Sequence, residues 1–283
     1  MNKMENDIQA QKRNYSLPLS IVTAAVILAF AWVYTTGLRA GPPTKIESQK
    51  KATEGTVLPI KWGELGQKLI ETGVIDETKF KAFYGDLGWI HDENLILAEE
   101  NSGKILNLLW AFGLSNKNRI LEEGPMADPS YGGANRFAST GGWTLARGNP
   151  MDHYSKHRFV TLTLDEQALV ERVAKNIYRP CCDNSTYFPD CNHGMAMLGL
   201  LELLASNGVN ESEMYRIALT VNSYWFPDTY LTVAKYLESK GMNLENTDPK
   251  EILGKNYSSA SGYRRILSEI TPVEGGGGGS CGV

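Results

Sequence analysis

Cysteine and histidine, the residues used most often for metal and thiol chemistry, are both scarce in this chain. The 283 residues include four of each. No C-x-x-C pair is present, which excludes the signatures of a zinc knuckle, a thioredoxin-type redox pair and covalent c-type haem. The phosphate-binding sequence G-x-x-x-x-G-K-[ST] is also missing, so a P-loop nucleotide site is excluded. Whether the protein is an enzyme stays undecided at this level.

An excess of positive charge is lacking as well. The chain has 28 Lys and Arg residues against 32 Asp and Glu residues, a formal net charge of -4. Proteins that bind nucleic acid or dock on anionic membrane surfaces usually carry a basic face that contacts phosphate groups. The balance therefore excludes nucleic acid as the expected partner.

One long hydrophobic run lies near the N-terminus. Residues 17–38 contain no charged side chain, and about 20 apolar residues span the hydrocarbon core of a membrane as a helix. Trp32 and Tyr34 lie toward its end, where aromatic rings favour the headgroup region. A buried core helix and a cleaved signal peptide are the alternatives, but the sequence around Ala40 is a poor cleavage site. We predict a transmembrane signal anchor at 17–38.

The flanking charges do not set the orientation of this anchor, because basic residues stand on both sides of it. A long domain is translocated largely regardless of charge. We therefore expect a short cytoplasmic leader at 1–16 and a polar tether at 39–56. The protein would be a single-pass protein of the cell membrane with a periplasmic or extracellular C-terminal domain. A protein partner in the same membrane is a further expectation.

The rest of the chain predicts a mainly α-helical globular domain over residues 57–272. Apolar residues recur at helical spacing, and helix-starting residues precede several of the runs. Thr163 and Glu166, for example, form the sequence of a capping box. The expected helices cover 62–72, 77–84, 93–112, 163–177, 193–207, 210–226, 227–240, a short segment from 248, and 263–270.

Two segments interrupt this helical pattern. Residues 124–160 are rich in glycine and predict one long loop, and long ordered loops are often functional. Residues 158–163 alternate briefly in the manner of a short strand. The last segment, residues 273–283, contains five consecutive glycines and predicts a flexible tail that ends near Cys281.

The feature most suggestive of chemistry is a group of cysteines and a histidine between two expected helices. Cys181, Cys182, Cys191 and His193 fall within thirteen residues. Cys191 and His193 stand at the expected start of a helix, where free N–H groups favour a thiolate and disfavour a charged imidazole. Thiolate and neutral imidazole bind soft or borderline metals.

We interpret the group as a site for a transition metal, with zinc, copper or iron as the candidates. Asp183 is a candidate oxygen or outer ligand. Cys281 is a candidate mobile ligand, because a glycine tail lets its thiol reach the site. Two alternatives remain open. The first is a thiol-disulfide redox protein in which Cys281 attacks a bridge in the loop. The second is a non-catalytic helical scaffold or binding module with one structural disulfide.

Histidines 153 and 157 are the remaining candidates for metal ligation. Their spacing of four residues would place both rings on one face of a helix, but Pro150 makes a helix uncertain there. We expect them to be exposed loop residues. If the cysteine group needs a fourth ligand, they rank ahead of His91.

Overall fold

The computed structural model describes residues 55–85, 88 and 94–273. The leader 1–16, the anchor 17–38, nearly all of the tether 39–56 and the tail with Cys281 lie outside these residues, as does His91. Within the described ranges, no helix combines the length and the apolar character needed to cross a membrane.

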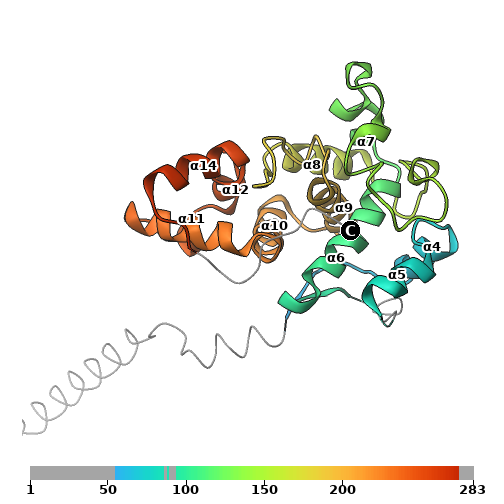
Figure 1. Ribbon diagram of the computed structural model, residues 1–283, viewed down its shortest axis with the longest axis horizontal. Coiled ribbons are helices and arrows are strands. Elements are labelled where there is room, and N and C mark those ends of the chain that lie inside the picture. Colours follow the sequence, from blue (N-terminus) through green and yellow to red (C-terminus); the bar gives the residue numbers. More distant parts are fainter. Residues whose placement is uncertain (1–54, 86–87, 89–93, 274–283) are drawn as a thin grey trace, which may run out of the picture. The chain divides into compact units, whose positions relative to one another are not determined.

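The described chain is mainly α-helical, as predicted (Figure 1). The α-helices are α4 Leu65–Glu71, α5 Glu77–Tyr84, α6 Ser102–Ser115, α7 Arg119–Glu123, α8 Leu164–Ala174, α9 Asn192–Ser206, α10 Glu211–Trp225, α11 Pro227–Ser239, α12 Pro249–Leu253, α13 Lys255–Ser258 and α14 Ala260–Glu269. Short 3-10 turns join several of them. In Figure 1, α11, α12 and α14 lie together on one side, and α4, α5 and α6 lie on the other.

The centre of the fold is the contact between α6 and α9, the most extensive between any two of the described elements. Nearly every residue of both helices is buried. Gly113 and Gly199 face each other at the crossing, and a Cβ atom at Gly113 would collide with the carbonyl oxygen of Met195. The two glycines therefore allow the helix backbones to approach closely, which fixes the start of α9 in space.

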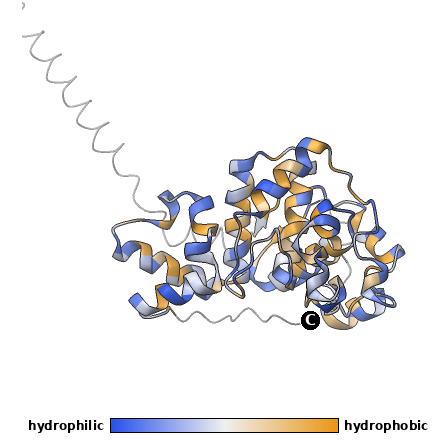
Figure 2. Ribbon diagram, turned by 90° about the horizontal axis from the view of Figure 1, so that it is seen from above, coloured by the Kyte–Doolittle hydropathy of each residue, from blue (hydrophilic) through white to orange (hydrophobic). Residues whose placement is uncertain are grey.

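Local sequence signals account for many of the helix ends. The Thr163 hydroxyl accepts the Glu166 N–H at 3.3 Å, and the Glu166 carboxylate accepts the Thr163 N–H at 2.7 Å, which is the predicted capping box. The side chains of Asp76 and Asn210 likewise each accept a backbone N–H from the first turn of α5 and α10, respectively. Hydrophobic and hydrophilic residues occur side by side along the helices (Figure 2), and α10 and α11, unlike α6 and α9, bury only one face.

Three expectations about the elements need correction. Residues 158–163 form no strand; the two-stranded sheet pairs β1 Thr56–Val57 with β2 Ile96–Leu97 instead. The helix expected from residue 93 begins at Ser102, after a 3-10 turn over Glu99–Asn101. The first expected helix begins at Leu65 rather than at 62. The glycine-rich segment 124–160 is a loop, as predicted, with short 3-10 turns and an isolated bridge from His157 to Asn116.

Candidate metal centre

The cysteines lie on the connection between α8 and α9. Its two halves run side by side, because Tyr178 and Ser185 form an antiparallel bridge and the Thr186 N–H donates to the Ile177 carbonyl at 2.8 Å. A turn closes the tip, where the Cys182 N–H donates to the Arg179 carbonyl. The connection then returns to Cys191 at the start of α9, so the tip and the helix start face each other.

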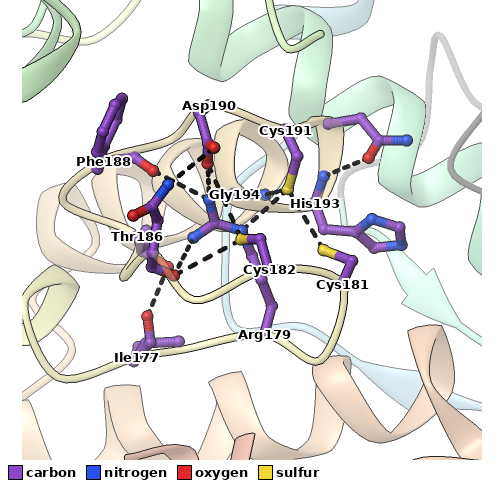
Figure 3. A network of polar contacts seen from close by, with 12 residues as sticks. Ile177, Arg179, Cys181, Cys182, Thr186, Phe188, Asp190, Cys191, His193 and Gly194 are labelled. Carbon is purple, nitrogen blue, oxygen red and sulfur yellow. Dashed lines mark hydrogen bonds and ion pairs between the residues drawn. The ribbon is translucent and has the colours of Figure 1, made fainter. Parts of the chain in front are cut away.

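Three of the predicted ligands converge at this place (Figure 3). Ligand atoms of Cys181, Cys191 and His193 all lie within 4.8 Å of one another, and the sulfurs of Cys181 and Cys191 are 3.5 Å apart. Cys181 is exposed, Cys191 is half-buried, and His193 is 2% exposed. The group can therefore hold a metal ion, and it extends from the surface into the interior.

The imidazole of His193 is positioned by aromatic packing. Its ring lies 4.4 Å from the ring of Phe226 and 5.8 Å from that of Trp225, measured between centroids. Both aromatic residues come from the end of α10 and the residue that follows it. These two rings cover the inner side of the Cys181, Cys191 and His193 group against water and restrict the orientation of the imidazole.

Cys191 is the N-cap residue of α9. Its sulfur accepts the Gly194 N–H at 3.4 Å. This contact satisfies one of the free N–H groups of the first turn and places the sulfur at the positive end of a 15-residue helix. The predicted position of Cys191 at a helix start is confirmed.

A buried arginine, which the sequence analysis did not predict, supports this sulfur. Arg179 is 1% exposed, and its Nε donates to the Cys191 sulfur at 2.9 Å. Its other nitrogens donate to the carbonyl oxygens of Asn184 and Phe188 and to the Asp190 carboxylate at 2.5 Å. Burial alone would lower the pKa of Arg179, but the charges of Cys191, Cys182 and Asp190 raise it, so the guanidinium stays charged.

Asp190, not Asp183, is the carboxylate that belongs to the site. One Asp190 oxygen accepts from Arg179, and the other accepts the Asn184 side-chain amide at 2.9 Å. Asp183 instead accepts the Ser261 N–H at 2.7 Å and pairs with Arg264 at 3.7 Å. The expectation that Asp183 serves the site is wrong, because its carboxylate is used to hold the start of α14.

The pKa values of the three thiols are shifted in different directions. Hydrogen bonds from Cys181 and then Cys182, the charge of Arg179 and a contact with His193 together hold the pKa of Cys191 well below its usual range, against the effect of burial. Hydrogen bonds with Cys182 and Cys191 raise the pKa of Cys181. For Cys182, the contact with Cys181 lowers the pKa, but the contact with Cys191 and burial outweigh it and raise the pKa to about 11. Of the three thiols, Cys191 therefore loses its proton most readily.

Cys182 lies in a second group with Asp190 and Cys191, whose ligand atoms also lie within 4.8 Å of one another. The Cys182 sulfur points toward Asp190 and the Asn184 carbonyl, each 3.9 Å away. Because both Asp190 oxygens already accept hydrogen bonds, this second group is the weaker ligand set.

A structural disulfide is not observed among the described cysteines. Cys181, Cys182 and Cys191 are free thiols, and the 3.5 Å between the sulfurs of Cys181 and Cys191 exceeds the covalent length of about 2.05 Å.

Histidines 153 and 157 form a separate pair. Nδ1 of His153 lies 3.1 Å from Nε2 of His157, and Nε2 of His153 lies 3.4 Å from the Arg147 carbonyl. Neither belongs to the two ligand groups found among the described residues. His153 is buried, so the expectation that both are exposed is wrong. Their imidazoles are engaged in local hydrogen bonds.

No protein-family model matches the chain, and no curated protein or solved structure is significantly similar to it. The assignment of a function therefore depends on the geometry of the site. The one sequence signal that could have indicated Arg179 is its place directly before Pro180 and the two cysteines, since Pro180 ends any helix there and turns the arginine into the loop.

Proposed function

We propose that this protein binds a soft or borderline transition-metal ion, with zinc, copper or iron as the candidates, through Cys181, Cys191 and His193. The observation that carries the proposal is the convergence of two sulfurs and one imidazole within 4.8 Å. Metal–sulfur bonds of about 2.3 Å and metal–nitrogen bonds of about 2.0 Å place ligands of one ion about 3.5 to 4 Å apart. The two sulfurs, 3.5 Å apart, already have this spacing, and the imidazole, within 4.8 Å of both, needs only a small approach.

Contacts around the ligands support the proposal. Arg179 and the Gly194 N–H both donate to the Cys191 sulfur, and hydrogen bonds of this kind orient and tune sulfur ligands. These two hydrogen bonds still leave the Cys191 thiolate with a lone pair that can bind an ion. Because Asp190 and Asn184 hold the arginine in turn, the outer contacts form a continuous network.

The exposure of the ligands suggests how an ion reaches the site. Cys181 is exposed while His193 is buried, so an ion would meet Cys181 first and His193 last. Three protein ligands leave room for a fourth. Cys281, which lies outside the described residues, stays the predicted mobile ligand for that position.

The proposed cellular setting follows from the sequence alone. Residues 17–38 would anchor the chain in the cell membrane and carry the helical domain to the outside. We expect a protein partner in the same membrane, which would exchange the ion through the exposed Cys181.

The test is the metal content and metal affinity of the full-length chain, kept in detergent. Cys191→Ser and His193→Gln should bind one equivalent far more weakly than the wild type; serine is a good N-cap, so the first variant keeps the start of α9. Cys182→Ser is the matched control and should keep the ion, because its sulfur faces Asp190. Equal binding by all four proteins would overturn the proposal.

A further inference from the structure

We infer that Cys181 and Cys191 also form a thiol–disulfide couple that accepts electrons from external dithiols when no metal is bound. The inference goes beyond metal binding and depends on a different property of the site, the unequal surroundings of its two closest sulfurs. These sulfurs are 3.5 Å apart. An approach of about 1.5 Å would bring them to the covalent distance, and Cys181 lies at the exposed tip of a turn.

The two sulfurs have different roles in such a bridge. Cys181 is exposed, so an incoming thiolate can attack its sulfur. The Cys191 sulfur lies deeper, at the start of α9, with Arg179 Nε at 2.9 Å and the Gly194 N–H at 3.4 Å. When the disulfide breaks, the thiolate formed on Cys191 is therefore stabilised by the positive charge of Arg179 and by the Gly194 N–H.

The reaction balances as a two-electron exchange. A thiolate of the external dithiol attacks the Cys181 sulfur, the Cys181–Cys191 bond breaks, and its electron pair stays on Cys191. The second thiolate of the substrate then attacks the sulfur of the first, forming the substrate disulfide and releasing Cys181, which takes up a proton. The dithiol is oxidised and the pair is reduced. Any stronger disulfide oxidant restores the bridge by the reverse exchange.

Arg179 should make the bridge more oxidising, because it stabilises only the reduced thiolate. The guanidinium is held by Asp190 at 2.5 Å and by two backbone carbonyls, so it is in place before the bond breaks. Loss of a charge-assisted hydrogen bond of this kind should change the equilibrium with glutathione about tenfold or more.

The first experiment uses the wild-type full-length chain with a chelator in buffers of reduced and oxidised glutathione. Peptide mapping after an acid quench should find one bridge, between Cys181 and Cys191. Brief treatment of the oxidised protein with reduced glutathione should place the mixed disulfide on Cys181. A mixed disulfide on Cys191, a bridge that uses Cys182 or Cys281, or no bridge at all would overturn the inference.

The second experiment compares Arg179→Met with Arg264→Met, which removes an exposed arginine that pairs with Asp183 next to Cys182. Arg179→Met should favour the disulfide about tenfold more strongly against glutathione, and the control should match wild type. Circular dichroism establishes that each variant is folded. An unchanged equilibrium in folded Arg179→Met would contradict the role of the arginine. If that variant fails to fold, the position of the mixed disulfide in the wild-type protein still tests the inference. Because a chelator is present, failure here does not bear on metal binding.

Discussion

Gly194 leaves the space that the guanidinium of Arg179 occupies. A Cβ atom at position 194 would lie 2.5 Å from Cζ of Arg179 and 2.9 Å from its Nε. The arginine is 1% exposed, and hydrogen bonds to Asp190 and to two backbone carbonyls hold its guanidinium in this position. A residue in the first turn of α9 therefore determines whether the charge beside Cys191 is in place.

Gly194→Ala should displace Arg179 and raise the pKa of Cys191, because the guanidinium and its hydrogen bond would be lost. The rate of alkylation of Cys191 by iodoacetamide at neutral pH should fall several-fold, and overpacking should destabilise the fold by about 1 to 3 kcal/mol. Gly103→Ala, whose new methyl group would meet nothing within 4 Å, is the control. Unchanged Cys191 reactivity in folded Gly194→Ala would show that the arginine does not control this thiol.

Metal affinity should rise with pH. The pKa of Cys181 is raised by its hydrogen bonds with Cys182 and Cys191, so this thiol is protonated in the metal-free protein and must release its proton on binding. One released proton gives about a tenfold gain in affinity for each pH unit. Competition with a chelator of known pH dependence between pH 6 and 8 measures the slope. A flat profile would mean that Cys181 keeps its proton and does not ligate the ion.

Glu202 should make folding stability decrease as pH rises. It is fully buried in α9, its carboxylate accepts the Asn116 amide at 2.5 Å, and burial raises its pKa to about 8. The unfolded chain ionises this group near its ordinary pKa of about 4.3. Stability is thus full below that value and is lost progressively until pH passes about 8, by on the order of 5 kcal/mol.

Glu202→Gln, which mimics the neutral acid, should remove this part of the pH dependence. Urea denaturation of wild type and variant at pH 5, 7 and 9 provides the comparison. The two curves should approach each other at pH 5 and separate at pH 9, with the variant more stable. A constant difference at all three values would contradict a raised pKa for Glu202.

The crossing of α6 and α9 should tolerate no side chain. A Cβ atom at Gly113 would collide with backbone atoms of Met195 and Gly199, which cannot rotate away. We expect Gly113→Ala to lower the free energy of unfolding by about 3 kcal/mol. Gly103→Ala, in the same helix but in open space, should have no effect or raise it by up to about 1 kcal/mol. Equal stability of the two variants would show that the helices are not in close contact.

The sequence predicted the features that depend on local signals. Helix α5 spans the predicted residues, because Asp76 caps it and Gly85 ends it. The placement of Cys191 and His193 at the start of α9 follows from the helical period after His193, and this placement brings two of the three ligands together.

The features that the sequence did not predict depend on contacts between distant segments. A two-residue strand such as Thr56–Val57 has too little alternation to be recognised, and it exists because of its partner Ile96–Leu97. Asp183 and Asp190 look equivalent in sequence, but only the fold brings Ser261 to the first and Arg179 to the second. Arginine is rarely buried without a partner, so its role could not be inferred without the position of Asp190.

The most direct test of the proposed metal site is X-ray absorption spectroscopy of the full-length chain loaded with one equivalent of zinc. The account predicts two sulfur ligands at about 2.3 Å and at least one imidazole nitrogen at about 2.0 Å, with one sulfur lost in Cys191→Ser. An ion surrounded only by oxygen and nitrogen, or a spectrum unchanged in that variant, would contradict a centre built from Cys181, Cys191 and His193.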